Sequence, residues 1–355
     1  MSGISDQRIA ERRVLFGPAA DALRAVRAPG PAALLGTPRS VALLGDDAFD
    51  GEFVRFDGAR HHNPRASVNE AGALVDARGC RSVVAIGSSA AIDLGKAVAD
   101  GRNVLLVLVP TALGGAEMSR GYGVLEGDRK AGGRLASPAP VVIYDAALLA
   151  SLPPRELGSI GINAWAHCIE AAYARTQHAL GTAAAVQAGR ALPALLLRAA
   201  ERRDDALHRA LFEAAHLAGF ALDARSMGLH HAVCHVAGGL TGFPHGINNA
   251  IVLPHAVRAN ARLAPEAVAT VARAFGVEDL AAQAEAIAAA YALPRTFAEL
   301  GAPADFVERA LPRVMEQPLL KNNPAQPDEA TVRALLEAAF AGRPAAAEPR
   351  SAGAR

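Results

Sequence analysis

The first 150 residues contain short runs that are apolar at nearly every position, and these runs limit the possible folds more than any other feature. Strands buried on both faces of a parallel sheet have this pattern. Segments with helical spacing, at 68–78 and 91–99, alternate with the runs. Such alternation predicts βαβ units and an open α/β sheet. The expected strands are 32–35, 53–56, 82–86, 104–109 and 141–144.

The pattern changes after Leu152-Pro153-Pro154. From there on, apolar residues recur at helical spacing and no convincing strand follows, so this part is expected to be all-α. A proline pair continues neither a helix nor a strand, and we place a boundary there, between domains 1–152 and 153–343. The tail 344–355 is rich in Ala, Pro and Arg and is expected to be disordered. The expected helices are 159–174, 181–200, 204–223, 264–275, 279–291 and 328–341.

The charge balance and the cysteines exclude several classes of protein. The 355 residues include 36 basic and 35 acidic ones, which argues against binding nucleic acid through bulk charge. The three cysteines, Cys80, Cys168 and Cys234, form no metal or disulfide pattern, which favours a reducing compartment. We see no signal peptide and expect no membrane span, so we expect a cytoplasmic protein.

Two turns that follow apolar strands are candidates for ligand binding. The first runs from Gly87 through Ser88 and Ser89 into a helix that carries Asp93 and Lys96. A turn of small residues at a helix N-terminus can bind a phosphate, although it can equally be a tight turn with capping serines. The second turn, 110–118, also follows a strand and would lie at the same edge of the sheet.

Histidines are concentrated in the helical part. Asn163 and His167 are four residues apart, as are His231 and His235, so each pair shares a helical face. His230 adjoins the second pair, and His245 and His255 each follow or lie beside a proline. A single histidine on an apolar helix is usually a core residue. Two spaced pairs favour a shared polar site for proton transfer or metal binding.

Basic side chains could hold the carboxylates of an anionic substrate. A planar guanidinium binds a carboxylate through two hydrogen bonds. The alternative is a solvated surface. The candidates are Arg120, Arg129, Lys130, Arg134, Arg225 and Lys321.

Together these segments resemble the iron-containing alcohol dehydrogenase family, and within it the maleylacetate reductases. The resemblance covers about residues 12–343. It is carried by 13–17, 93–96, 110–111, 117–118, 126–130, 142–145, 152–154, 161–167, 228–236, 244–245 and 252–255.

The resemblance implies a dehydroquinate-synthase-like fold, with a nucleotide-binding α/β domain followed by a helical domain, and a homodimer. It implies NADH or NADPH as the cofactor, held by Gly87, Ser88, Ser89, Asp93, Lys96, Thr111 and Glu117. The ligands of a divalent metal, Fe or Zn, would be Asn163, His167, His231 and His245. His235 falls at the position of the family's proton-relay histidine. Arg129, Lys130, Arg225 and His230 are the candidates for contacts with the small anionic substrate.

Three departures from the family pattern bear on this assignment. Asn163 replaces an aspartate, and an amide is a weaker ligand for a hard or borderline metal. Ser88, Ser89 and Ala90 stand in the phosphate turn where the family has mainly glycine, and 112–116 lacks the usual polar residues. The segment between 35 and 53 has room for only one abbreviated helix.

These departures leave several functions open. The first is an NAD(P)H-dependent reductase of an unsaturated oxo-diacid, with His235 as the proton donor and the other histidines, Asn163 and any metal polarising the substrate. The second is a homologue without nicotinamide chemistry that uses the histidines for elimination, cyclisation or isomerisation. The third is a metal-dependent alcohol dehydrogenase, and the fourth is a non-catalytic binding protein.

Overall fold

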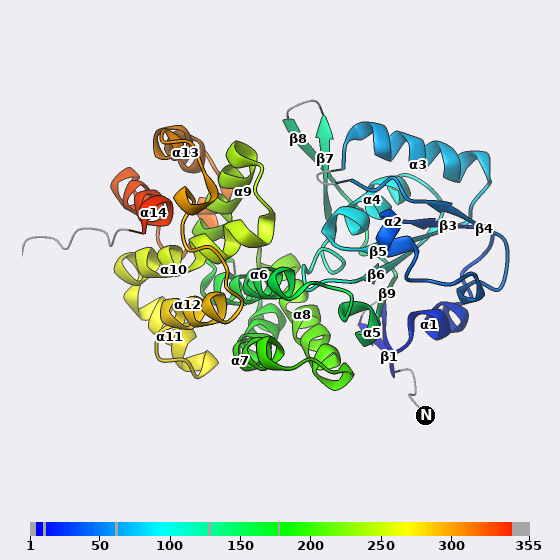
Figure 1. The fold of residues 1–355 in the computed structure, drawn as a ribbon, viewed down its shortest axis with the longest axis horizontal. Helices are drawn as coiled ribbons and strands as arrows, with labels where there is room; N and C mark the ends of the chain where they lie inside the picture. Colours follow the sequence, from blue (N-terminus) through cyan, green and yellow to red (C-terminus); the bar gives the residue numbers. More distant parts are fainter. Residues whose placement is uncertain (1–4, 10–11, 61–62, 127–128, 177, 343–355) are drawn as a thin grey trace, which may run out of the picture.

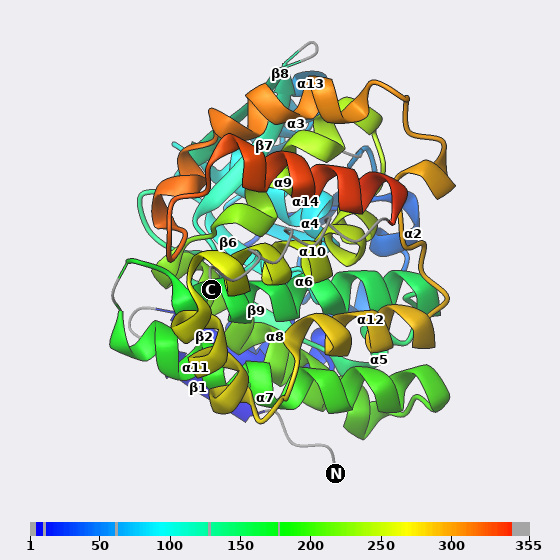
Figure 2. The same ribbon diagram turned by 90° about the vertical axis from the view of Figure 1, so that its left-hand side faces the viewer.

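The computed structural model describes residues 5–9, 12–60, 63–126, 129–176 and 178–342. An α/β part and a helical part lie side by side, and the chain passes from the first to the second at α6 (Figure 1). Figure 2 looks from the helical side and shows the helices in front of the sheet. The expected fold class, an α/β domain followed by a helical one, is confirmed. The tail 344–355 lies outside the described residues.

The sheet of the α/β part has seven strands in the order β1-β2-β9-β6-β5-β3-β4. Only β1 pairs antiparallel, with β2; the other neighbours pair in parallel. The central strands are buried along nearly their whole length, which explains their continuous apolar character. The strands are β1 (Ser5–Ile9), β2 (Arg12–Phe16), β3 (Ala32–Leu35), β4 (Phe53–Phe56), β5 (Ser82–Gly87), β6 (Leu105–Pro110) and β9 (Val141–Tyr144).

All five expected strands are present within about one residue of their predicted ends, but four others were not predicted. β1 and β2 lie at one edge of the sheet, and their first two residues are polar or charged. β7 (Gly121–Glu126) and β8 (Arg129–Arg134) form a separate two-stranded hairpin that is rich in glycine and charge. None of the four has the apolar run on which the prediction depended.

Four helices and a 3-10 turn connect the strands, and a fifth helix, α5, follows β9. The connection between β3 and β4 consists only of the four-residue α2 and η1 (Asp46–Ala48), which confirms the abbreviated segment. α4 packs closely on β5, since a Cβ on Gly95 would lie 2.3 Å from the Ala85 Cβ. The helices are α1 (Ala19–Val26), α2 (Pro38–Val41), α3 (Arg65–Ala77), α4 (Ser89–Ala99) and α5 (Ala146–Leu149).

The helical part is built around α6, which contacts α7, α8, α10 and α12. Trp165 on α6 is fully buried and its Nε1 donates to the Gly189 carbonyl on α7 at 3.0 Å. All six expected helices are found, together with α9, α10 and α13. The set is α6 (Pro154–Tyr173), α7 (Ala179–Glu201), α8 (Asp205–Arg225), α9 (Leu229–Thr241), α10 (His245–Leu263), α11 (Pro265–Phe275), α12 (Leu280–Ala290), η2 (Ala298–Leu300), α13 (Phe306–Met315), η3 (Pro318–Asn322) and α14 (Glu329–Ala341).

By length and hydropathy, α7 could cross a membrane. It lies against α6 and α8, and 44% of its most apolar window is buried inside the protein. Core helices of globular proteins pass the same test, and we interpret α7 as one of them.

Candidate active site

One face of α6 carries three buried polar side chains. Asn163, His167 and Glu170 follow one another at spacings of four and three residues, so they share this face. Asn163 and His167 are each 4% exposed and Glu170 is 1% exposed. Glu170 was not among the predicted site residues. Its spacing of three from His167 is the signal that could have identified it.

The first turn of α9 meets this face. His231 Nδ1 lies 2.5 Å from Glu170 Oε2, and the backbone N–H of His230 donates to Glu170 Oε1 at 2.8 Å. The carboxylate therefore receives a helix N-terminal amide as well as an imidazole. A carboxylate on one ring nitrogen fixes the orientation of the histidine and directs the other nitrogen into the site.

The remaining histidines extend the cluster outward. His167 and His231 stack with ring centroids 4.8 Å apart. The rings of His235 and His245 lie 6.0 Å apart, and each is 6.1 Å from the ring of His231. His235 and His245 are exposed, whereas His167 and His231 are buried. The structure thus brings together the four histidines that were predicted to share a site.

Burial determines the charge of the inner histidines. It lowers the pKa of His167 and of His231 well below the ordinary value, and the neighbouring imidazoles lower both further. Burial also raises the pKa of Glu170, although His230 and backbone N–H groups oppose this shift. The inner histidines are therefore neutral at pH 7 and can donate or accept hydrogen bonds.

The donor set does not fit a tightly bound divalent metal. His231 needs a proton on Nδ1 to face the Glu170 carboxylate, so its Nε2 keeps a lone pair, 3.2 Å from Asn163 Oδ1. A half-turn of the Asn163 amide presents its NH2 group to that lone pair, which a carboxylate could not do. Asn163 therefore satisfies His231 without a cation. Glu170, His230 and His231 also bring ligand atoms within 4.8 Å of one another, but they are buried and already bonded together.

The N-terminus of α4 is the turn where the sequence predicts a phosphate to bind. Gly87 has φ +143°, a conformation that favours glycine, and its carbonyl accepts from the Thr111 N–H at 3.0 Å. Ser88 and Ser89 are exposed with ordinary backbone angles, so their side chains cause no strain there. The free N–H groups and hydroxyls of this turn are suited to a phosphate.

The second turn joins the nucleotide side to the histidine cluster. Gly115 has φ +75°, and a Cβ there would lie 3.1 Å from Gly219 Cα on α8 and 3.6 Å from His167 Nδ1. A Cβ on Gly114 would lie 2.7 Å from Ser89 Oγ. His167 Nδ1 is buried and has no hydrogen-bond partner among the described residues. The turn is therefore positioned between the phosphate turn and the histidines.

Three residues predicted to bind the cofactor lie behind this turn. Lys96 is fully buried, and its Nζ lies 2.9 Å from both Asp93 Oδ1 and the Ala116 carbonyl. Glu117 is 1% exposed and accepts from the Tyr144 hydroxyl at 2.8 Å. Asp93 also accepts from the Gly123 N–H. These contacts do not support direct binding of the cofactor by Asp93, Lys96 or Glu117.

The predicted substrate contacts are placed differently. Arg225, the last residue of α8, is 2% exposed and donates to the Ala174 carbonyl at the C-terminal end of α6 and to Thr182 Oγ1 in the first turn of α7. The negative ends of the dipoles of α6 and α8 favour a cation at this position. His230 is fully buried and lies 3.3 Å from the Asn249 carbonyl. Neither placement supports contact with a substrate. The side chains of Arg129 and Lys130 lie outside the described residues.

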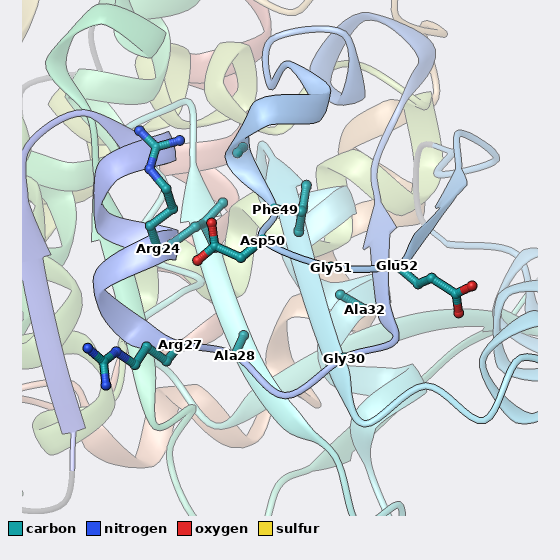
Figure 3. A pocket seen from close by; sticks show the side chains of 11 residues that line it. Arg24, Arg27, Ala28, Gly30, Ala32, Phe49, Asp50, Gly51 and Glu52 are labelled. Carbon is teal, nitrogen blue, oxygen red and sulfur yellow. The ribbon is translucent and has the colours of Figure 1, made fainter.

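A pocket of about 230 Å³ lies at the opposite edge of the sheet, where β3 and β4 begin (Figure 3). Its rim carries Arg24, Arg27, Asp50 and Glu52. Ligands of open α/β sheets bind beyond the carboxyl ends of the strands, so this pocket is not the nucleotide side of the site.

The fold and the site define an oxidoreductase of the iron-containing alcohol dehydrogenase type. The model of the Fe-containing alcohol dehydrogenase family, C-terminal part, matches residues 159–340, and the iron-containing alcohol dehydrogenase model matches 41–146. The chain belongs to this family.

Within the family, the relatives named maleylacetate reductase are similar over most of the chain. The one from Burkholderia cepacia is 35% identical, covering 93% of this chain and 96% of the relative. The crystal structure of maleylacetate reductase from Agrobacterium tumefaciens has a TM-score of 0.85 at 28% identity, covering 96% and 99% of the two chains. The sulfoacetaldehyde reductase of Bifidobacterium kashiwanohense, solved with NAD+, shares the fold at 20% identity, with a TM-score of 0.85 and coverage of 96% and 100%. These matches do not favour the non-redox, alcohol dehydrogenase or non-catalytic alternatives.

Proposed function

We propose that this chain catalyses the NAD(P)H-dependent reduction of an unsaturated oxo-diacid such as maleylacetate. The observation that carries the proposal is the close approach of the turn at Gly115 to His167, because it brings the histidines near the carboxyl ends of the strands, where ligands of open α/β sheets bind. The similarity to maleylacetate reductases over nearly the whole chain supports the choice of substrate. NADH and NADPH are both candidates for the reductant.

The residues of the chain would divide the work between binding and proton transfer. The N-terminus of α4, with Ser88 and Ser89, would hold the pyrophosphate of the dinucleotide. A dihydronicotinamide held there would supply a hydride to the carbon of the double bond that lies β to the ketone. As that bond forms, the double-bond electrons shift to the ketone oxygen, and the α carbon then takes up one proton. The product is the saturated oxo-diacid, and the oxidised nicotinamide remains.

The exposed His235 would deliver this proton, because it reaches solvent and can be reprotonated after each turnover. The neutral His231, oriented by Glu170, would hold the amide of Asn163, and the second N–H of that amide would donate a hydrogen bond to developing negative charge on the substrate. His167 and His245 would complete the polar wall. Because the donor set does not fit a metal, no step depends on one.

The test is oxidation of NADH or NADPH by the purified protein in the presence of maleylacetate, followed by the absorbance of the reduced nicotinamide. We expect His235→Ala to lower kcat by about 10²-fold or more. His255→Ala is the matched control, because it removes a histidine from α10 outside the cluster. The proposal fails if the wild type oxidises neither nucleotide with maleylacetate and calorimetry detects no nucleotide binding.

We further propose that two copies of the chain associate into a homodimer and that the substrate is a small dianion. Membership of the family supports the first point, and the similarity to the reductases supports the second. Sedimentation equilibrium would measure the mass of the assembly, and a monomer at micromolar concentration would contradict the dimer.

A further inference from the structure

Three consecutive residues of the second turn are each held from behind by a buried side chain from a different element. Lys96 on α4 donates to the Ala116 carbonyl at 2.9 Å, and also to Gly121. Tyr144 on β9 donates to the Glu117 carboxylate at 2.8 Å. Arg12 on β2 donates to the carbonyl of Met118 at 3.1 Å and to its sulfur at 3.0 Å. We call Lys96, Glu117 with Tyr144, and Arg12 the loop clamp.

The charges of the loop clamp are balanced inside the protein. Lys96 forms an ion pair with Asp93 at 2.9 Å, and the attraction of Lys96 and Arg12 favours the ionised form of Glu117. Burial raises the pKa of Glu117 and lowers that of Arg12. Two cations and two carboxylates thus compensate one another in a region from which water is largely excluded. Removing one partner from such a set is costly, so the arrangement resists displacement.

The front of the same turn faces the site. Gly115 touches Gly219 and lies beside His167, while Gly114 lies beside Ser89. The clamp also reaches the helical part, because the Tyr144 hydroxyl lies 3.5 Å from His216 Nδ1 on α8, one turn before Gly219. Buried polar groups therefore hold the turn from behind, and its front faces the groups that would carry out the reaction.

We propose that the loop clamp positions the second turn between the nucleotide and the histidine cluster, so that Lys96, Glu117 and Arg12 act on the reaction without touching substrate or cofactor. This inference rests on the proposed function, because it assigns the clamp a role in binding the nicotinamide. It also explains why these cations and this carboxylate are buried behind the turn instead of facing the site.

The test variant is Tyr144→Phe, which removes the hydroxyl bonded to Glu117 and retains the ring that stacks on Phe16. The matched control is Tyr291→Phe. Tyr291 is also buried and its hydroxyl donates a single hydrogen bond, to the Leu196 carbonyl at 2.7 Å, within the helical part. Each variant therefore loses one buried hydroxyl, but only the Tyr144 hydroxyl belongs to the clamp; Tyr144→Phe also removes the 3.5 Å contact with His216.

Two measurements distinguish positioning from loss of stability. Hydrogen exchange of the amides in 111–119 should accelerate about tenfold in Tyr144→Phe and stay unchanged in Tyr291→Phe. The KM for the nicotinamide nucleotide should rise about fivefold in Tyr144→Phe only. A general loss of folded protein would instead lower kcat and leave KM unchanged. If exchange in 111–119 is unaltered, or altered equally in both variants, the clamp is refuted.

Failure of the proposed function can be distinguished from failure of the clamp. If the wild type binds neither NADH nor NADPH, the proposed function is overturned, while hydrogen exchange still decides whether the clamp holds the turn. Glu117→Gln provides a second variant if Tyr144→Phe does not fold. Glutamine keeps an acceptor for the Tyr144 hydroxyl but removes the charge that faces Lys96 and Arg12. We expect a rise in nucleotide KM of about threefold, and an unchanged KM would count against the clamp.

Discussion

Replacing Gly115 by alanine should impair the reaction more than it impairs the fold. Gly115 has φ +75°, and an alanine in that conformation costs about 1 kcal/mol. The new Cβ would also lie 3.1 Å from Gly219 Cα, closer than the 3.4–4 Å of ordinary contacts. Because the neighbour is backbone, the turn or α8 must shift by a few tenths of an ångström.

This shift would occur next to His167 Nδ1, which would lie 3.6 Å from the same Cβ. A displacement of about 1 Å can cost a catalytic site about 10²-fold in rate. A shift of a few tenths should therefore lower kcat/KM about three- to tenfold. The loss of activity follows from the close contact with Gly219, and its size depends on how far the turn moves.

Gly101→Ala is the matched control. Gly101 has nearly the same φ, +73°, but a Cβ there has no neighbour within 4 Å. Both variants should lose about 1 kcal/mol in the free energy of unfolding, measured with urea, and only Gly115→Ala should lose activity. Equal activity of the two variants would refute the argument that the Gly115–Gly219 contact aligns the turn with His167.

Three further predictions address the metal, the phosphate turn and the pH dependence. Asn163→Asp should allow the site to retain about one equivalent of Fe or Zn through dialysis, because a carboxylate cannot donate to His231 Nε2 but can bind a cation. Metal analysis of the wild type and the variant tests this. Stoichiometric metal in the wild type would contradict the interpretation that its donor set does not fit a metal. Ser88→Asp should leave the free energy of unfolding unchanged or raise it, since residue 88 is the N-cap of α4 and aspartate is a good N-cap. The same change should raise the nucleotide KM about tenfold, because the carboxylate repels the pyrophosphate. An unchanged KM would show that the pyrophosphate does not bind at this turn. Burial and the nearby Arg12 lower the pKa of His216 from 6.5 to about 4, so the unfolded chain binds more protons between these values. His216 should therefore contribute a fall of up to about 3 kcal/mol in the free energy of unfolding as the pH decreases through this range, and His216→Phe should remove this part of the dependence.

The buried parts of the fold were the parts that the sequence could predict. Continuous apolar runs identified the five central strands, and helical spacing identified most of α6 to α14 within a few residues. β1, β2 and the β7–β8 hairpin lack such runs: β2 has only three consecutive apolar residues, and the hairpin strands contain several glycines and charged residues. β1 pairs with the adjacent β2 and β7 with the adjacent β8, whereas β2 joins the sheet through β9, which is remote in the sequence.

The site was predictable where it depends on spacing within one helix. His167, His231 and His235 were identified in this way and His245 by the proline before it, and the structure brings the four together. Spacing does not reveal which side of a turn a residue occupies, so Lys96 and Glu117 were assigned to the cofactor although they lie behind the turn. Likewise, Arg225 could be identified as a cation, but not as one held by helix ends.

The burial of Trp165 determines what its fluorescence can report. It is the single tryptophan of the chain, is shielded from water, and is bonded to the backbone of α7 instead of facing the histidines. Its emission should therefore be blue-shifted in the native protein and move to the red as α6 separates from α7. A ligand at the site would affect this emission only by energy transfer over a distance. Quenching without a shift of the spectrum would therefore indicate a bound ligand, and a red shift would indicate that the helical part has opened.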